Sequence, residues 1–202
     1  MTLVKICGIT ALGDAVAAVE AGAFAIGFNF YPPSPRHIDI ESARAIAQEL
    51  PKEIWRVGVF VNAERETVER IAERVGLDAL QFQGNEPVDY CRGWGQKVIK
   101  AVRVRERADL ERVAAYPVEL VLVDAYVEGV PGGTGTRLDW GLLDGMDRGR
   151  LLLAGGLTPQ NVAEAVRTVR PFAVDVASGV EVGPGIKDRE KVRRFIRNAQ
   201  TA

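Results

Sequence analysis

The chain has 202 residues, which is enough for one well-buried core and short for two. Its 26 basic and 27 acidic residues nearly cancel, so no overall electric field favours binding to nucleic acid or to an anionic membrane. Two cysteines, Cys7 and Cys91, make neither a disulfide framework nor a metal-ligand cluster, and a single histidine, His37, argues against paired-histidine metal sites. The sequence shows no membrane-spanning run and no signal peptide, so we expect a cytoplasmic protein.

Apolar, strand-like runs alternate with segments of helical period along the chain. Strands are predicted at 3–7, 24–29, 55–61, 79–82, 97–102, 119–123, 151–154 and 172–176. Helices are predicted at 11–21, 40–50, 64–75, 86–93, 107–114, 159–169 and 188–199. We expect Thr10 to cap the first helix, with Leu12, Ala15, Val16 and Val19 on its inner face. Thr158 and Pro159 suit the N-cap and first position of the helix at 159–169.

These predicted strands are almost continuously apolar, which is typical of a parallel sheet covered on both faces. Eight β/α units within 202 residues predict an α/β fold, a compact (β/α)8 TIM barrel that forms a single domain over residues 1–202. An open doubly wound sheet is the alternative, although it would usually need only five or six strands.

The active site of such a barrel lies at the carboxyl ends of its strands. Cys7 ends the first predicted strand and is followed by Gly8, so its thiol is a candidate catalytic group; a buried structural cysteine is the alternative. Asp124 ends the sixth predicted strand, where a partly desolvated carboxyl group suits a general acid. A structural ion pair between Asp124 and an arginine or Lys5 is the alternative. Asp175, inside the eighth strand, is a second candidate for the acid but is more consistent with a structural role.

Glycine pairs follow the last two predicted strands, at Gly155-Gly156 and Ser178-Gly179, and a further Gly-Gly-Thr-Gly turn ends at Gly135. Glycines allow backbone N–H groups to approach an anion, and the loops after strands seven and eight are the usual phosphate site of these barrels. We therefore expect a phosphorylated small-molecule ligand, although glycines that merely end strands would give the same pattern.

Two further segments are candidates for substrate contact. Arg36 follows a proline-rich loop and could offer its guanidinium group to a carboxylate, while a plain surface arginine is the alternative. Residues 125–138 form a long connection that suits a lid over the phosphate, or else a surface loop without function. His37 is read as peripheral and Cys91 as a helix or core residue.

Taken together, several motifs resemble the phosphoribosylanthranilate isomerase family of tryptophan biosynthesis. They run in order along the chain: Lys5-Ile-Cys7-Gly-Ile-Thr10, Gly27-Phe-Asn-Phe30 with Ser34-Pro-Arg36, Val57-Gly-Val-Phe-Val-Asn62, Asp124, Gly132-Gly-Thr-Gly135, Leu153-Ala-Gly-Gly-Leu157, Asp175-Val-Ala-Ser-Gly-Val-Glu181 and Pro184-Gly-Ile-Lys-Asp188. The glycine turns alone are shared with other phosphate-binding barrels. The joint pattern is specific.

This resemblance implies an Amadori rearrangement of N-(5-phosphoribosyl)anthranilate to 1-(2-carboxyphenylamino)-1-deoxyribulose 5-phosphate, with neither metal nor cofactor. It implies that Asp124 is the general acid, Cys7 the general base and Arg36 the residue that holds the anthranilate carboxylate. The phosphate would be held by the backbone around Gly135, Gly155, Gly156, Ser178 and Gly179. One position departs from the family pattern, because Gln83 stands where the family usually has histidine.

The nearest alternative activity is the sugar isomerase of histidine biosynthesis, whose first strand ends in aspartate and which has two phosphate sites. Here the first strand ends in Cys7, and the glycine pairs lie only in the last quarter of the chain, which favours a substrate with one phosphate. The non-enzymatic alternative is a barrel that binds a phosphorylated ligand without catalysis, which would need neither Cys7 nor Asp124. The sequence leaves the oligomeric state open, with a homodimer as one option.

Overall fold

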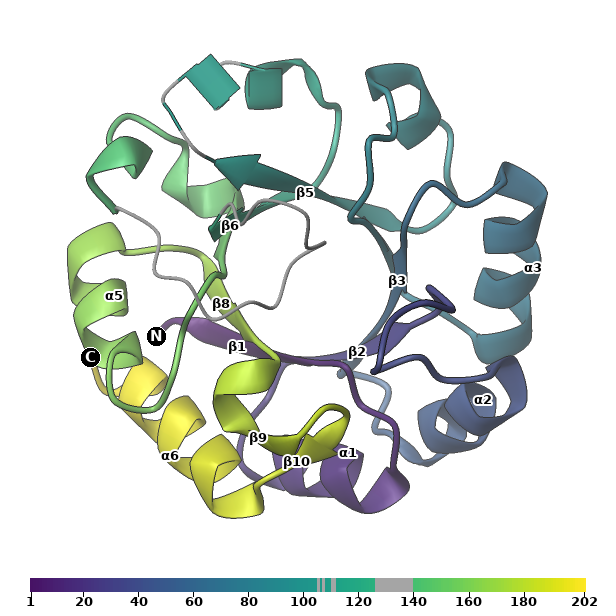
Figure 1. The fold of residues 1–202 in the computed structure, drawn as a ribbon, viewed down its shortest axis with the longest axis horizontal. Coiled ribbons are helices and arrows are strands. Elements are labelled where there is room, and N and C mark those ends of the chain that lie inside the picture. Colours follow the sequence, from purple (N-terminus) through teal and green to yellow (C-terminus); the bar gives the residue numbers. More distant parts are fainter. Residues whose placement is uncertain (105, 107, 110–111, 126–139) are drawn as a thin grey trace.

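The computed structural model describes residues 1–104, 106, 108–109, 112–125 and 140–202. At its centre is a closed barrel in which eight strands follow one another in sequence order and β1 pairs in parallel with β8 (Figure 1). The strands are β1 (Leu3–Cys7), β2 (Ala25–Asn29), β3 (Trp55–Phe60), β4 (Ala79–Phe82), β5 (Lys97–Val104), β6 (Leu120–Ala125), β7 (Leu151–Leu153) and β8 (Ala173–Val176). This closure confirms the (β/α)8 prediction and rules out the open sheet.

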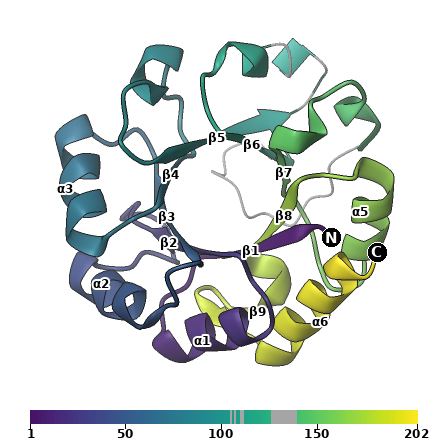
Figure 2. The same ribbon diagram turned by 180° about the vertical axis from the view of Figure 1, so that it is seen from behind.

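Helices surround the barrel, and the two chain ends lie side by side at its rim (Figures 1 and 2). The α-helices with assigned bounds are α1 (Leu12–Glu20), α2 (Ile40–Glu49), α3 (Arg65–Val75), α5 (Val162–Val169) and α6 (Arg189–Gln200). The apolar residues at helical spacing in α2, α3 and α6, which the sequence pattern places on the inner face of each helix, are buried: Ala43, Ile46 and Ala47 in α2, Val68, Ile71, Ala72 and Val75 in α3, and Val192, Phe195, Ile196 and Ala199 in α6. Among the described residues, no helix has the length and apolar character needed to cross a membrane.

The inner face predicted for α1 was only partly right. Ala15 is buried and Val19 packs against the core as expected, but Leu12 and Val16 are 43% and 38% exposed, and Ala17 and Ala18 are buried in their place. Small side chains let this helix pack closely against the barrel, so its larger residues face outward. Thr10 does not cap the helix; its hydroxyl group instead donates to the Gly185 carbonyl oxygen at 2.6 Å.

Two other helix predictions also need correction. The helix expected from residue 159 begins at Val162, because Thr158-Pro159 opens an extra turn in which the Asn161 and Val162 N–H groups donate to the Thr158 carbonyl. The segment 86–93 forms only a 3-10 helix, Val88–Cys91, within the short stretch between Pro87 and Gly93. The helix expected at 107–114 lies partly outside the described residues, which include a 3-10 helix at Arg112–Ala115.

A small hairpin that the sequence analysis did not predict follows β8. After a 3-10 turn at Ser178–Val180, the chain forms β9 (Glu181–Gly183) and β10 (Ile186–Lys187), which pair antiparallel. Hydrogen bonds hold the hairpin against the start of α1, including one from the Lys187 backbone N–H to Asp14 Oδ2 at 2.9 Å. The hairpin therefore brings residues from the end of the chain next to the end of β1.

The barrel interior is filled by a compact cluster of small and medium apolar side chains. Its buried members are Ala25, Val57, Ala79, Ile99, Ala101, Leu120, Leu122, Leu152, Ala154 and Ala173. Lys5, which is fully buried, pairs in register with Ala25 on one side and with Asp175 on the other. Since Ala25 and Ala173 occupy little volume, they leave room for a long charged side chain inside the barrel.

Candidate active site

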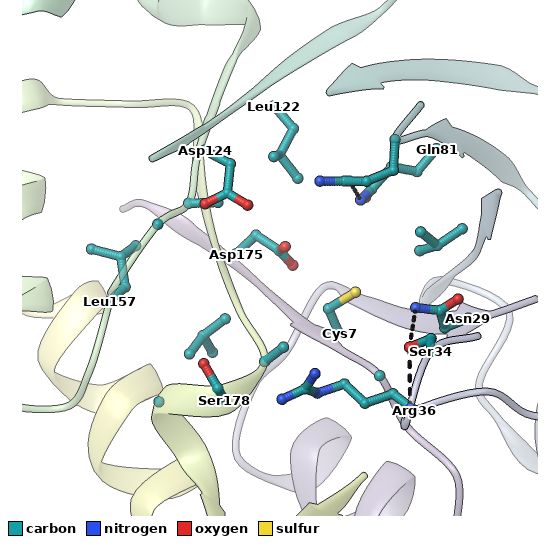
Figure 3. Close-up of a pocket in the computed structure, with 18 of the residues that line it drawn as sticks. Cys7, Asn29, Ser34, Arg36, Gln81, Leu122, Asp124, Leu157, Asp175 and Ser178 are labelled. Carbon is teal, nitrogen blue, oxygen red and sulfur yellow. Dashed lines mark hydrogen bonds between the residues drawn. The ribbon is translucent and has the colours of Figure 1, made fainter. Parts of the chain in front are cut away.

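A pocket opens at the carboxyl ends of the strands, and side chains from both halves of the chain line it (Figure 3). Cys7 enters from β1 and Asp124 from β6, on different sides of the pocket (Figure 3). The remaining described lining residues include Arg36, the Gly155-Gly156 pair and the Ser178-Gly179 pair. All the described site residues that the sequence analysis proposed therefore lie in one pocket.

The position of Cys7 follows from a sharp turn after β1. Gly8 adopts φ +73°, a left-handed conformation that suits glycine, and the N–H groups of Gly8 and Ile9 both donate to the Gly27 carbonyl. The Cys7 side chain is partly exposed to the pocket. Burial raises the pKa of this thiol above its ordinary value, whereas the nearby Lys5 charge acts to lower it.

Lys5 does not pair with Asp124, which was one structural alternative. Its ammonium nitrogen lies 2.8 Å from Asp175 Oδ1, and the side chains are 0% and 10% exposed. Burial lowers the pKa of Lys5, but the charge of Asp175 and the interaction with Cys7 outweigh it, so the net shift is upward and Lys5 stays charged. The sequence analysis favoured a structural role for Asp175, which does pair with Lys5, but Asp175 also lines the pocket.

Asp124 occupies the end of β6, where Arg103 of β5 is its register partner. The residue is only 7% exposed and faces the pocket next to Leu122 (Figure 3). Its carboxyl group therefore sits between an apolar barrel interior and the pocket, as the sequence pattern predicted.

Arg36 is held by contacts at its backbone, along its alkyl stem and at its guanidinium group. Its backbone N–H donates to Ser34 Oγ at 3.1 Å, and that hydroxyl oxygen also accepts from Asn29 Nδ2 at the end of β2. The alkyl stem packs on Gly8, where an added Cβ would come within 2.6 Å of Arg36 Cδ. The guanidinium group donates to both carboxylate oxygens of Glu181.

Glu181 thus already occupies one edge of the Arg36 guanidinium group. Arg36 donates these bonds from its Nε and Nη2 atoms at 2.7–3.2 Å, whereas its Nη1 atom donates to none of the described residues. Glu181 is also bound by Lys187, whose Nζ lies 2.6 Å from Glu181 Oε1 and 2.6 Å from the Cys7 carbonyl oxygen. Arg36 is therefore a fixed cation with one nitrogen left for a ligand.

The loops after β7 and β8 meet closely at the candidate phosphate site. Gly155 and Gly156 both have positive φ, +87° and +64°. A Cβ on Gly179 would overlap the Leu157 carbonyl, so these loops can touch only because Gly179 lacks a side chain. Among the described residues, no partner accepts from the N–H groups of Gly155, Gly156, Ser178 or Gly179. Gly135, with the rest of the Gly132–Gly135 turn and the lid expected at 125–138 beyond Ala125, lies outside the described residues.

The sequence analysis missed three polar residues beside the site. Glu181 and Lys187 carried no signal beyond their place in the family motifs, because they belong to the unpredicted hairpin. Gln81 ends up 2% exposed in the pocket lining, where its Nε2 donates to Gln83 Oε1 at 2.8 Å. Its position near the end of the fourth strand was the available clue. Within the described ranges, no group of His, Cys, Asp or Glu side chains is placed to hold a metal ion.

Comparison with known proteins identifies the family. Residues 4–198 match the family described as N-(5'phosphoribosyl)anthranilate (PRA) isomerase. The chain belongs to this family. It is 53% identical over 195 residues to the N-(5'-phosphoribosyl)anthranilate isomerase of Pseudomonas fluorescens, covering 95% of each chain. The corresponding protein of Trichlorobacter lovleyi is 52% identical over 204 residues, with both chains covered completely.

Solved structures of the same family share the barrel. The phosphoribosyl anthranilate isomerase of Thermotoga maritima superposes with a TM-score of 0.93 at 47% identity, with 100% of both chains covered. Another family structure was solved in complex with reduced 1-(o-carboxyphenylamino)-1-deoxyribulose 5-phosphate and matches with a TM-score of 0.89 at 46% identity, again with 100% coverage of each chain. The family resemblance predicted from the sequence motifs is confirmed.

Proposed function

We propose that the chain catalyses the Amadori rearrangement of N-(5'-phosphoribosyl)anthranilate to 1-(2-carboxyphenylamino)-1-deoxyribulose 5-phosphate, a step of tryptophan biosynthesis. The observation that carries this proposal is the pairing of Cys7 and Asp124 across one pocket in a chain of this isomerase family. An aldose-to-ketose isomerisation of this kind needs one proton donor and one proton acceptor. The two residues supply both.

Asp124 acts as the general acid in the first step. Its proton goes to the ribose ring oxygen, the C1–O bond breaks, and the nitrogen lone pair forms the C1=N bond of a Schiff base. Asp124 lines the pocket and is only 7% exposed, so its carboxyl group faces the ligand site with little access for bulk water.

Cys7 acts as the general base in the second step. The thiolate takes the proton from C2, the C–H electron pair forms the C1=C2 bond, and the C1=N pair returns to nitrogen. The resulting enolamine tautomerises to the ketone. Asp124 and Cys7 enter from different sides of the pocket, which is compatible with proton transfer at two neighbouring positions of one sugar (Figure 3).

The two ends of the substrate carry negative charge, and we assign each end to a different part of the pocket. The free Nη1 edge of Arg36 holds the anthranilate carboxylate, while Glu181 fixes the opposite edge. The backbone N–H groups at Gly155, Gly156, Ser178 and Gly179 bind the phosphate, and Gly135 is proposed to join them. Support for a phosphorylated ligand comes from the relative solved with a reduced ribulose 5-phosphate compound.

A direct assay tests this function. Purified full-length protein is mixed with freshly made N-(5'-phosphoribosyl)anthranilate, and the loss of its fluorescence is followed. We expect turnover by the native chain and a drop of about a hundredfold or more in Asp124→Asn and Cys7→Ala, the usual scale for losing a general acid or base. Both variants should still bind the reduced product analogue. Near-native rates in either variant would remove that residue from the mechanism, and no turnover by the native chain would refute the function.

Cellular location and assembly are proposed separately. We place the enzyme in the cytoplasm, where amino acid biosynthesis supplies its substrate. A homodimer is also proposed, because one similar structure comes from a phosphoribosylanthranilate isomerase described as dimeric and engineered into monomers. Light scattering of the purified chain would distinguish monomer from dimer.

A further inference from the structure

The Cys7 thiol lines the pocket, and its burial there disfavours the thiolate, which is the form that a base requires. Burial raises its pKa, and the charge of Asp175 raises it further. A thiol that stays protonated cannot take a proton from carbon. If Cys7 is the base, some other group must stabilise its thiolate.

Lys5 is placed to do this. It precedes Cys7 by two residues on β1, so both side chains point into the barrel. An added Cβ on Gly27 would lie 3.2 Å from Lys5 Nζ and 2.9 Å from Cys7 Sγ, which places both atoms against the same glycine. The Lys5 charge acts to lower the pKa of the nearby Cys7 thiol, so this placement favours the thiolate.

Asp175 completes the arrangement from the neighbouring strand. Lys5 and Asp175 are register partners on β1 and β8, and their side chains are joined at 2.8 Å. An isolated buried ammonium group would tend to lose its proton. The Asp175 carboxylate opposes this loss, so Lys5 remains a permanent charge beside the sulfur.

The other charged groups near the thiol are partly neutralised. Lys187 binds the Cys7 carbonyl oxygen from β10, and Arg36 approaches from the loop after β2. Both of these cations share Glu181. Within the described chain, the cations Lys5, Lys187 and Arg36 outnumber the anions Asp175 and Glu181 by one, so ionisation of Cys7 balances the set. Asp124 faces the pocket from β6 as the proposed general acid.

We propose that Lys5 is a positioning residue for proton transfer, whose ammonium group stabilises the Cys7 thiolate while Asp175 holds that ammonium group in place. Lys5 does not line the pocket and so acts through Cys7 rather than on the substrate. The inference rests on the proposed function, since it concerns Cys7 as the base. In the reaction the C2 proton moves to Cys7 Sγ, and Lys5 keeps its own proton throughout.

The experiment measures how the reactivity of the Cys7 thiol depends on pH. Cys91→Ala serves as the background, because it leaves Cys7 as the only cysteine. Iodoacetamide alkylation of Cys7 is followed from about pH 6 to pH 10, a range that brackets the ordinary thiol pKa. In Lys5→Met we expect alkylation at neutral pH to fall about tenfold or more, and the rise with pH to move to higher pH.

Asp175→Asn should also slow alkylation of Cys7. Without its carboxylate partner the buried Lys5 ammonium group tends to lose its proton, and the thiolate then loses its stabilising charge. In the Lys5→Met background the same change should instead speed alkylation, because Asp175 then acts on the thiol only as an opposing charge. The double variant Lys5→Met/Asp175→Asn keeps the buried charges balanced and protects against misfolding. It should still react more slowly than the background, because Lys5 has the larger influence on the thiol.

A second buried ion pair provides the matched control. Lys100 Nζ lies 2.7 Å from Glu86 Oε2, and both side chains are almost fully buried. Lys100→Met and Lys100→Met/Glu86→Gln should lose stability without a shift in the alkylation profile of Cys7. If Lys5 had a purely structural role, Lys5→Met would likewise lose stability and leave the alkylation profile of Cys7 unchanged.

Turnover provides the second readout. In Lys5→Met we expect kcat to fall near neutral pH and to recover as the pH rises, while the Kd for the reduced product analogue changes little. An unchanged alkylation profile in folded Lys5→Met, or faster alkylation in Asp175→Asn than in the background, would overturn the inference. Alkylation needs no turnover, so inactivity of the native chain would refute only the isomerase function.

Discussion

Arg36 shows how a binding residue can be fixed before its ligand arrives. Glu181 takes one edge of the guanidinium group, Lys187 fixes Glu181, and the Arg36 stem rests on Gly8. Burial alone raises the pKa of Glu181, but hydrogen bonds and charge from Arg36 and Lys187 outweigh it and hold that pKa below its ordinary value. Less side-chain freedom is then lost when a carboxylate binds at Nη1.

Replacing Glu181 with glutamine tests this at the scale of one residue. Glu181→Gln keeps the shape but weakens the charged hydrogen bonds to Arg36, each of which typically contributes about 1.5–3 kcal/mol. We expect KM to rise about tenfold or more, with a smaller change in kcat, and we expect the melting temperature to fall. Glu190→Gln is the matched control, since in the part of the chain that the structure describes the Glu190 side chain makes a single exposed ion pair, at 3.9 Å with Arg193. Equal effects in the two variants would contradict a specific role for Glu181.

The sequence located Cys7 and Asp124 in the pocket because the carboxyl ends of parallel strands are fixed by the local pattern, and it located Arg36 in the loop after β2. Their catalytic and binding roles stay predictions. The partners of these residues could not be predicted in the same way. Glu181 reaches Arg36 across 145 residues of sequence, a pairing that only the closed fold creates.

At the scale of the helices, the buried face could be predicted only where an apolar face lies opposite a charged one. The charged outer faces of α3 and α6 made their buried stripes easy to identify. α1 lacks that contrast, because alanines form its buried side and Leu12 and Val16 face outward. β9 and β10 contain three and two residues, too few for a period to be read.

The contact between the β7 and β8 loops yields a prediction at this scale. In Gly179→Ala the new methyl group would collide with the Leu157 carbonyl and push the two loops apart. We expect a stability loss of about 1–3 kcal/mol, as for other overpacked sites, together with weaker binding of inorganic phosphate. Gly95→Ala is the control, because a Cβ there would have no atom within 4 Å. Denaturant melts and phosphate titration would show the difference, and equal behaviour of the two variants would refute the close contact.

At the level of the whole molecule, the candidate active site lies at one end of the barrel, and the described connections at the other end of the barrel take no part in it. The pocket lies at the carboxyl ends of the strands, while exposed connections such as Pro51–Glu53 lie at the opposite ends. The chain ends are adjacent at the rim in both views (Figures 1 and 2). Alternation of strands and helices was sufficient to predict this architecture, whereas the charge pairs that cross the β1–β8 seam were not predictable from local pattern.

Circular permutation tests this separation. We expect a permutant with its natural ends joined by a short flexible linker, and new ends between Lys52 and Glu53, to fold and to keep turnover within about tenfold of the native chain. A permutant opened between Ser34 and Pro35 should fold but lose affinity for substrate, because that cut releases the loop that holds Arg36. Circular dichroism and kinetics would separate the two cases, and similar loss of activity in both would contradict the prediction.

The seam between β1 and β8 also has a consequence for the order in which the protein is made. Lys5 and Asp175 are 170 residues apart, and Lys187 reaches the Cys7 carbonyl across 180 residues. Cys7 is therefore synthesised long before three of its charged neighbours, Asp175, Glu181 and Lys187. A nascent or prematurely terminated chain carries this thiol in an incomplete electrostatic setting, and the proposed base is complete only when β8 and the β9–β10 hairpin dock.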